Sequence, residues 1–290
     1  MSSRQAWTYF AAQRWAAGQL VASDVDPSAP QFLLEQRHDW DTTHLLLHNR
    51  EQMPADEITW FQRAVAQLLN HVPAQYIVGQ TSFYGRQFKV TPAVLVPEAE
   101  TAELVEWVLA ALPADRELRV LDLGTGSGVI GITLALERPC WSVTLSDISP
   151  AALAVARENA QRHQLALPLV ESDLFANLAD QRYDVIVTNP PYIDPAATAL
   201  MDQAVLENEP RVALFADEHG LGFYHRLFEQ AGRHLRPSGQ LFGETGYDQE
   251  QSIQALLKRC DQQARMAVRH DVAGKMRMIH AWDFSGTGGN

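Results

Sequence analysis

A short apolar strand that runs directly into three closely spaced glycines and then a helix restricts the fold of this chain more than any other feature. The segment reads Val120-Leu121-Asp122-Leu123-Gly124-Thr125-Gly126-Ser127-Gly128, and we expect a helix over Val129–Glu137 after it. Such a loop directs backbone N–H groups into the crevice at the carboxyl edge of a parallel sheet. Glycines also permit positive φ and close approach of a ligand. A tight strand-to-helix turn without a ligand is the simpler alternative.

The residues after position 101 alternate between strand and helix patterns. We expect strands at 119–123, 141–146, 167–170, 183–188 and 240–243, and helices at 129–137, 151–163, 221–234 and 249–260. This alternation specifies an α/β fold with a mostly parallel, Rossmann-like sheet and helices on both faces. Two last strands, 264–270 and 276–282, have no helix between them, which predicts an antiparallel hairpin at the sheet edge.

The N-terminal part shows only helical periodicity. An apolar stripe at i, i+3, i+4 spacing predicts the first helix, and its members are Trp7, Phe10, Ala11, Trp15 and Leu20. A hairpin follows at 81–84 and 87–90, with its turn at Gly85-Arg86. We therefore expect a helical domain at 1–72, a linker with a hairpin at 73–100, an α/β domain at 101–284 and a loose tail at 285–290.

Composition excludes several classes of protein. The chain of 290 residues has 23 Lys and Arg against 35 Asp and Glu, a formal charge of −12, which opposes non-specific binding to phosphate backbones. Two cysteines, Cys140 and Cys260, form neither a disulfide framework nor a zinc-type cluster, so we expect no metal. Neither a signal peptide nor a run of about 18 apolar residues is apparent, so we expect a cytoplasmic protein without a membrane partner.

Two acidic residues narrow the choice of ligand for the glycine loop. Residues 126–131 also fit the G-x-G-x-x-G pattern of NAD-binding proteins, which is weak by itself. Asp122, just before the first glycine, would repel a pyrophosphate and suits a cationic amino group. Asp147 ends the next strand, 19 residues past Gly128, where a carboxylate can accept both ribose hydroxyls. Asp147 could instead cap the helix that begins near Pro150. The whole pattern resembles the class I S-adenosylmethionine-dependent methyltransferases.

The strand at 183–188 runs directly into Asn189-Pro190-Pro191-Tyr192. Two prolines cannot continue the ladder, so the chain leaves the sheet beside the glycine loop. The Asn189 amide and the Pro190 carbonyl can hold a planar –NH2 group by its hydrogens, and the Tyr192 ring can cover its face. Turn chemistry alone could also explain Asn-Pro. The element resembles the signature of methyltransferases that act on the amino groups of adenine or cytosine, or on glutamine amides.

The chain as a whole resembles the HemK/PrmC family of release-factor glutamine methyltransferases. Besides the glycine loop and residues 189–194, the resemblance is carried by residues 73–79, Phe83-Tyr84-Gly85, Phe88, residues 94–97, Glu209-Pro210, residues 271–275 and Arg277. The resemblance implies transfer of a methyl group from S-adenosylmethionine, leaving S-adenosylhomocysteine, to the glutamine amide in the Gly-Gly-Gln motif of class 1 peptide-chain release factors. That modification modulates translation termination, and the helical domain would help to dock the release factor.

The resemblance also assigns site residues. Positions that match cofactor contacts in the family are Gly124, Thr125, Gly126, Ser127, Gly128, Asp147, Leu174 and Asn189, to which we add Asp122. The substrate amide would be held by Asn189, Pro190, Pro191 and Tyr192, with Asn189, Pro190 and Tyr192 as the catalytic group. An ordinary core leucine is the alternative for Leu174.

One departure keeps other functions open. Family members follow the position of Pro97 with Arg-Pro-Glu/Asp-Thr-Glu, whereas this chain has Glu98-Ala99-Glu100-Thr101-Ala102. A protein that binds release factors or the cofactor without turnover is therefore one alternative. A DNA or RNA adenine methyltransferase is another, but residues 1–90, with 7 Lys and Arg and 8 Asp and Glu, carry no basic stripe. We expect a monomer that makes no direct contact with nucleic acid.

Overall fold

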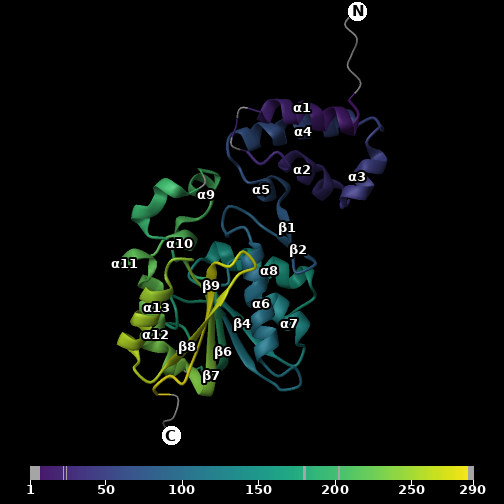
Figure 1. Ribbon diagram of the computed structural model, residues 1–290. Coiled ribbons are helices and arrows are strands. Elements are labelled where there is room, and N and C mark those ends of the chain that lie inside the picture. Colours follow the sequence, from purple (N-terminus) through teal and green to yellow (C-terminus); the bar gives the residue numbers. More distant parts are fainter. Residues whose placement is uncertain (1–6, 22, 24, 179–180, 202, 287–290) are drawn as a thin grey trace, which may run out of the picture. The chain divides into compact units, whose positions relative to one another are not determined.

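The computed structural model describes residues 7–21, 23, 25–178, 181–201 and 203–286, which form two compact units (Figure 1). The described residues up to Thr81, together with the helix α9 (Gln203–Asn208), make up the first unit. The second unit comprises the remaining described residues from Ser82 onward. The division lies in the segment expected to be a linker. Residues 287–290 of the expected tail lie outside the described residues.

The first unit is helical throughout. Its other helices are α1 (Tyr9–Leu20), α2 (Ala29–His38), α3 (Thr42–His48), α4 (Ala55–Leu69) and α5 (Ala74–Val78). The buried face of α1 consists of Tyr9, Ala12, Ala16 and Leu20, whereas Phe10 is 53% exposed. The helix was predicted correctly, and so was the burial of Leu20, but Phe10 was wrongly assigned to the core face, and Tyr9, Ala12 and Ala16 on that face were missed. Trp7 and Trp15 are half-buried and pack against the edge of the core.

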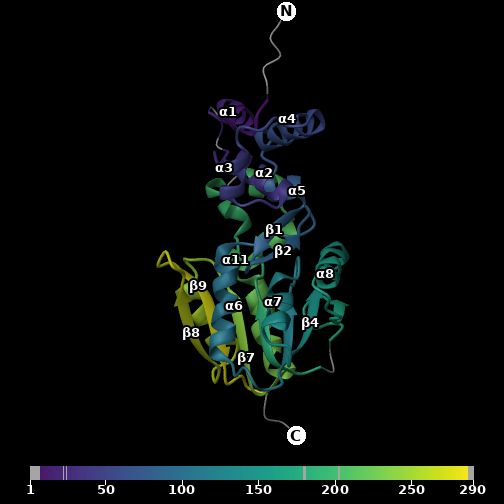
Figure 2. The same ribbon diagram turned by 90° about the vertical axis from the view of Figure 1, so that its right-hand side faces the viewer.

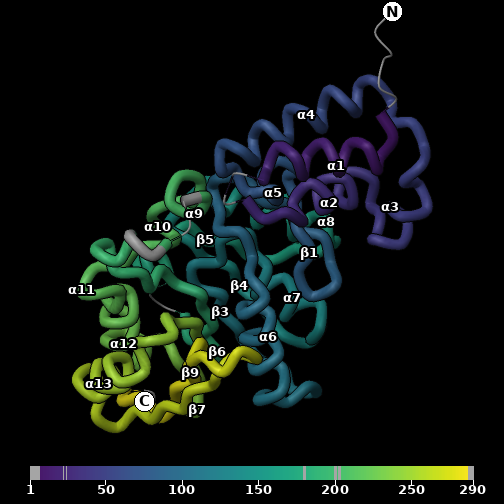
Figure 3. The backbone as a smooth tube through the Cα atoms, turned by 45° about the horizontal axis from the view of Figure 1, so that its top comes forward, coloured from purple at the N-terminus to yellow at the C-terminus, as the bar shows by residue number. Residues whose placement is uncertain are grey.

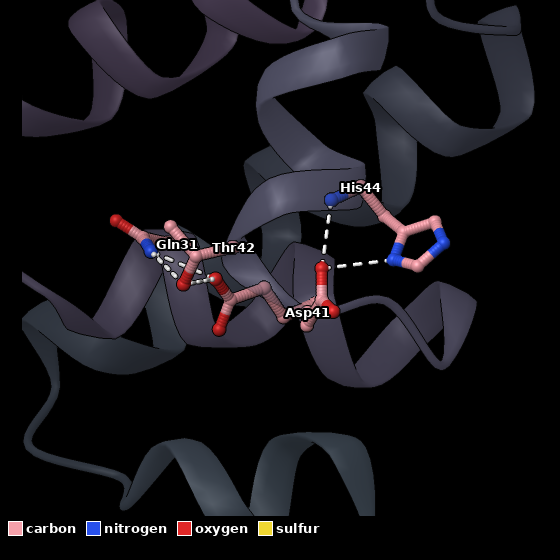
Figure 4. A network of polar contacts seen from close by, with 5 residues as sticks. Gln31, Asp41, Thr42 and His44 are labelled. Atoms are coloured by element: carbon pink, nitrogen blue, oxygen red, sulfur yellow. Dashed lines mark hydrogen bonds and ion pairs between the residues drawn. The ribbon is translucent and has the colours of Figure 1, made fainter.

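Polar contacts fix the short helix α3 (Figure 4). The Asp41 carboxylate accepts a hydrogen bond from the backbone N–H of His44 at 2.8 Å, which satisfies one of the free donors of the first turn. The Thr42 hydroxyl and the Gln31 amide both donate to Glu35, at 2.8 and 2.7 Å, so that α2 and α3 are joined through one carboxylate.

A hairpin of β1 (Gln80–Phe83) and β2 (Arg86–Lys89) follows. Its turn is Tyr84-Gly85, with φ of 51° and 71°, rather than the Gly85-Arg86 that we predicted. Positive φ at both central residues is the type I′ turn that matches the twist of a hairpin. The prediction was therefore wrong by one residue.

The second unit is built on a seven-stranded sheet. The order is β5 (Leu169–Glu171), β4 (Ser142–Asp147), β3 (Arg119–Leu123), β6 (Tyr183–Thr188), β7 (Leu235–Glu244), β9 (Met276–Trp282) and β8 (Arg265–His270). The first five are parallel to one another, and β9 is antiparallel to both β7 and β8. Strands β5, β4, β3 and β6 lie in this order in Figure 3. The predicted α/β fold and edge hairpin are confirmed.

Alternate residues of the strands face two separate cores. Helices α6 (Ala99–Ala111), α7 (Val129–Glu137) and α8 (Pro150–Arg162) cover one face, where Val120 and Val185 are buried (Figure 2). Helices α12 (Gly222–His234) and α13 (Glu250–Cys260) cover the other, where Leu121 and Ile186 are buried. This period-2 division is what a sheet buried on both sides requires.

Several elements were not predicted. These are α5, α6, α9, the 3-10 helix η1 (Pro195–Leu200), and the short helices α10 (Arg211–Leu214) and α11 (Asp217–Gly220). Strand β7 also begins at Leu235 rather than at 240. It pairs with β6 at Leu235, opposite Tyr183, and again from Gln240, opposite Val185, with an irregularity in register between these two points that contains Pro237 and Gly239.

The described residues form neither a membrane-spanning helix nor a cluster of metal ligands. None of the helices that they form is both long and apolar enough to cross a membrane. The His, Cys, Asp and Glu side chains of the same residues do not gather in groups of three or more that could hold a metal ion.

Gly131 on α7 gives a test of the packing between helix and sheet. A Cβ at this position would lie 2.2 Å from Cδ2 of Leu145 and 2.9 Å from Oδ2 of Asp122. We expect Gly131→Ala to lower the free energy of unfolding by about 1–3 kcal/mol in urea titrations. The matched control is Gly18→Ala in α1, where a Cβ meets nothing within 4 Å. That change should raise stability by about 0.5–1 kcal/mol. Equal effects of the two changes would contradict the packing described.

Candidate active site

A cavity of about 370 Å³ lies at the carboxyl edge of the sheet in the second unit. It is lined by residues at the carboxyl ends of four neighbouring parallel strands: Gly124 and Gly126 after β3, Asp147 at the end of β4 with Ile148 and Ser149 after it, Ser172, Asp173 and Leu174 after β5, and Asn189, Pro190 and Pro191 after β6. Residues 93–95 and several residues between Pro210 and Arg226 complete the wall. Ligands of open α/β sheets bind at this edge.

The glycine loop brings bare backbone to the cavity. Gly124, Gly126 and Gly128 have φ of 72°, 55° and 86°, values that side chains rarely allow. The backbone N–H groups of Gly124 and Thr125 donate to the carbonyl of Ser146 at 2.8 and 2.9 Å, and that of Gly128 donates to the carbonyl of Thr125. Our expectation that these amides point into the crevice was therefore wrong. Gly124 and Gly126 line the cavity by their close approach instead.

Asp122 lies beneath this loop and does not line the cavity. It is fully buried, and its Oδ2 accepts from the Thr125 hydroxyl at 2.6 Å and the Gly131 N–H at 2.8 Å. Burial raises the pKa of the Asp122 carboxyl to about 6, against the effect of these two donors. Its Oδ1 has no partner among the described residues. Thr125 and Ser127 are buried too, and the Ser127 carbonyl accepts from Asn159.

Asp147 does line the cavity, at the end of β4. Its Oδ2 accepts from the Gly126 N–H and its Oδ1 from the Ser149 N–H, both at 2.9 Å. Burial raises the pKa of this carboxyl, whereas the Ser149 and Gly126 N–H groups lower it. The alternative role that we considered, capping the following helix, belongs to Ser149, whose hydroxyl accepts from the Ala152 N–H. Each Asp147 oxygen keeps a lone pair for a further donor.

Leu174 has both of the features that we considered for it. It lines the cavity and is also part of the core beneath α12. Its φ of 48° is unusual for leucine, and the Ser172 hydroxyl holds the turn by donating to the Leu174 carbonyl at 2.8 Å. The turn thus directs an apolar side chain to the wall of the cavity.

The Asn-Pro-Pro-Tyr element divides between the cavity and the interior. Asn189, Pro190 and Pro191 line the cavity, and Asn189 Nδ2 donates to the Thr101 hydroxyl at 3.0 Å. Tyr192 is not one of the lining residues, and its hydroxyl donates to Oε1 of Glu244 at 3.1 Å. The structure therefore brings Gly124, Gly126, Asp147, Leu174 and Asn189–Pro191 to one cavity, and places Asp122, Thr125, Ser127, Gly128 and Tyr192 around it.

Sequence reasoning missed two polar residues behind Asn189. The Thr101 hydroxyl, on the unpredicted helix α6, donates to Oε2 of the fully buried Glu244 at 2.8 Å. Glu244 ends β7, so a carboxylate at the carboxyl end of a predicted strand was the available signal. Thr101 has no comparable signal, because its partner lies 143 positions away.

The residues present suit a nucleoside with a charged amino acid portion. The cavity volume is in the range of small-molecule sites, and its walls are mainly apolar with a few polar groups. On the cavity wall, Asp147 offers carboxylate oxygens to hydroxyl groups, whereas the Asp122 carboxyl lies buried beneath the loop and adds negative charge near it. S-Adenosylmethionine has both a ribose and a cationic amino group.

Comparisons with known proteins agree with this arrangement. The model of the PrmC N-terminal domain matches residues 11–79, and that of the methyltransferase small domain matches residues 104–214. The release factor glutamine methyltransferase of Enterococcus faecalis is 37% identical over 94% of this chain and 98% of that protein. The enzyme of the same name from Streptococcus pneumoniae is 39% identical over 90% of this chain and 93% of its own length. This chain belongs to the release factor glutamine methyltransferase family.

Solved structures support the fold of this family member. A methyltransferase from Pyrococcus furiosus superposes with a TM-score of 0.53 at 17% identity, over 78% of this chain and 99% of that one. A Thermus thermophilus 16S rRNA methyltransferase in complex with AdoMet and guanosine gives 0.51 at 20% identity, over 70% of this chain and 49% of that one. The methyltransferase fold and the family resemblance seen in the sequence are confirmed.

Asp147 gives a test of the cofactor site. We expect Asp147→Ala to weaken binding of S-adenosylmethionine by roughly 1.5–3 kcal/mol in calorimetry, because a charge-assisted acceptor is lost. Glu171→Gln is the matched control, since Glu171 pairs with Asp147 in the neighbouring strand but is exposed and does not line the cavity. Equal affinity of both variants for the cofactor would remove Asp147 from the site.

Proposed function

We propose that this protein transfers a methyl group from S-adenosylmethionine to the side-chain amide nitrogen of a glutamine in a peptide-chain release factor. S-Adenosylmethionine is the methyl donor in such methyltransferases, and S-adenosylhomocysteine is the product. The observation that carries the proposal is the position of Asn189 and Pro190 on the wall of the same cavity as Asp147. The names of the relatives supply the substrate class.

The chemistry requires positioning more than a base. The lone pair of an amide nitrogen is delocalised into its carbonyl, so the nitrogen is a poor nucleophile. When bound, the cofactor supplies an electrophilic methyl group on a sulfonium. Asn189 Nδ2 is held by Thr101, and no described residue donates to Asn189 Oδ1. Oδ1 and the Pro190 carbonyl therefore accept the two hydrogens of the substrate amide and turn its nitrogen toward the methyl group. The apolar walls of the cavity exclude water from the reaction.

The finer assignment extends this proposal to class 1 release factors and their Gly-Gly-Gln loop. Every protein displays many glutamines, so a choice among them draws on contacts remote from the reacting amide. The helical unit provides a surface for those contacts. Because the chain is acidic, we propose that it binds the release factor without contacting nucleic acid or a membrane. Its translation-factor substrate would place the enzyme in the cytoplasm, where we propose that it acts as a monomer.

Asn189→Ala is the direct test of the chemistry. We expect the variant to lose turnover on intact release factor while it keeps most of its affinity for S-adenosylmethionine, because Asn189 holds the substrate amide. Transfer of label from radiolabelled cofactor to release factor measures the first quantity, and calorimetry measures the second. DNA is the parallel substrate in the same assay. Labelling of DNA but not of release factor by the unaltered protein would contradict the proposed function.

The docking role of the helical unit has its own test. Leu46 and Leu47 on α3 are 63% and 74% exposed, an apolar pair that forms no part of the core of their unit. We expect Leu46→Asp with Leu47→Asp to raise KM for intact release factor about tenfold or more, as loss of apolar contact area would. Methylation of a short Gly-Gly-Gln peptide should stay unchanged. Val21→Asp, at an apolar position that is 85% exposed at the end of α1, is the control. A similar KM in both variants would exclude α3 from docking.

A further inference from the structure

A chain of buried hydrogen bonds runs from the cavity wall into the interior of the second unit. Asn189 Nδ2 donates to the Thr101 hydroxyl at 3.0 Å, and that hydroxyl donates to Glu244 Oε2 at 2.8 Å. The other carboxylate oxygen of Glu244 accepts from the Tyr192 hydroxyl at 3.1 Å. Thr101 is buried and Glu244 is completely so, which makes these bonds strong and their loss costly.

The direction of each bond in this chain is determined by its inner end. An ionised carboxylate can only accept hydrogen bonds, so the Thr101 hydroxyl must donate its single proton to Glu244. The Thr101 oxygen is then left as an acceptor, and it takes a proton from the Asn189 amide. The amide must therefore turn its nitrogen toward Thr101, which leaves the carbonyl oxygen as the group free to accept from a substrate.

We propose that Glu244, acting through Thr101, is the positioning residue that sets the orientation of the Asn189 amide and thereby makes the site accept an –NH2 group. This inference rests on the proposed function, because it explains how the site would hold an amide donor. Tyr192 is tied to the same carboxylate, so both ends of the Asn-Pro-Pro-Tyr element are fixed by one buried acid.

The charge of Glu244 is set by groups on every element around it. Burial, with a smaller contribution from the nearby Glu98 carboxylate, raises the pKa of the Glu244 carboxyl to about 7, against the opposing effects of the Thr101 and Tyr192 hydroxyls and of Arg277 on β9. Tyr224 on α12 donates to the backbone carbonyl of Glu244. Glu100 lies near Glu98, and Asp271 near Arg277, to which it is hydrogen-bonded at 3.2 Å.

Protonation of Glu244 would reverse the chain of bonds. A protonated carboxyl can donate to Thr101, whose proton is then free to point at Asn189 and favours the amide oxygen. The amide turns, and it presents a donor to a substrate group that is itself a donor. Activity should therefore be lost as the pH falls through the pKa of Glu244, and the loss should appear in kcat rather than in cofactor affinity.

Three variants test the chain of bonds. Thr101→Val removes the hydroxyl but keeps the shape, and we expect kcat on release factor to fall about 10–100-fold with cofactor affinity unchanged. Thr101→Ser restores the hydroxyl and should restore most of kcat. The control is Thr133→Val on α7, since the buried Thr133 hydroxyl has no hydrogen-bond partner among the described residues. Equal kcat in the two valine variants would overturn the proposal.

The pH profile distinguishes positioning from a structural role. The kcat of the unaltered protein should fall as the pH is lowered through the pKa of Glu244, and this acid limb of the profile should be absent in Glu244→Gln. In Glu98→Gln the limb should move to lower pH, because removal of a nearby negative charge lowers the pKa of Glu244. An acid limb that survives unchanged in Glu244→Gln would overturn the proposal.

A measurement without catalysis separates this inference from the proposed function. Selective ¹⁵N labelling of asparagine gives side-chain amide signals, and Asn189→Asp identifies that of Asn189. In the full-length protein this signal should shift between about pH 5 and about pH 9, and the midpoint of the shift should coincide with the pH at which kcat falls to half. The signal should not shift in Glu244→Gln. If the unaltered enzyme fails to methylate release factor but the signal shifts, the proposed substrate is wrong and the positioning is right. A signal independent of pH would overturn the positioning role.

Discussion

The parallel pairing of β3 with β4 and β6 is the constraint on which the site depends. Leu123 pairs with Ser146 and Asp122 with Val187, so the three strands end at one level of the sheet. The last residue of β4 and the first residues after β3 and β6 then lie at the same edge, which brings Asp147, Gly124 and Asn189 to one cavity. Because register is set by the buried alternation on both faces, a slip of one residue would exchange side chains between the two cores and displace the residues of the site.

Two buried carboxylates hold that edge together. Asp122 ties the glycine loop to α7 through Thr125 and Gly131, and Glu244 ties α6 to the Asn-Pro-Pro-Tyr element through Thr101 and Tyr192. A buried acid is costly unless donors surround it, so each carboxylate requires its donors to stay in place. The rigidity that a poor amide nucleophile demands therefore comes from residues that do not line the cavity.

Local patterns in the sequence were sufficient to predict the sheet and the loops at its edge. The glycine loop, Asp147 and Asn189 each follow a short apolar run, and such runs are recognisable one at a time. The core face of α1 was harder to predict from the sequence, because small residues face the interior there. Ala12 and Ala16 are buried whereas Phe10 is exposed, so the size of a side chain did not indicate its face. Thr101 and Glu244 were missed because their contact depends on tertiary structure and not on spacing.

The acidic segment that departs from the family pattern fits the same structure. Glu98 precedes the first residue of α6, where the positive end of the helix dipole favours an acid, and it is not one of the residues that line the cavity. Arg277 lowers the pKa of both Glu98 and Glu244, so one cation stabilises the negative charge of two acids next to Thr101 and Tyr192.

An arginine at position 98 would favour the ionised form of Glu244, whereas the glutamate found here opposes it. The departure therefore acts less on the cofactor than on the proton that Glu244 carries. In the positioning role that we propose for Glu244, it would raise the pH at which the Asn189 amide becomes able to hold its substrate.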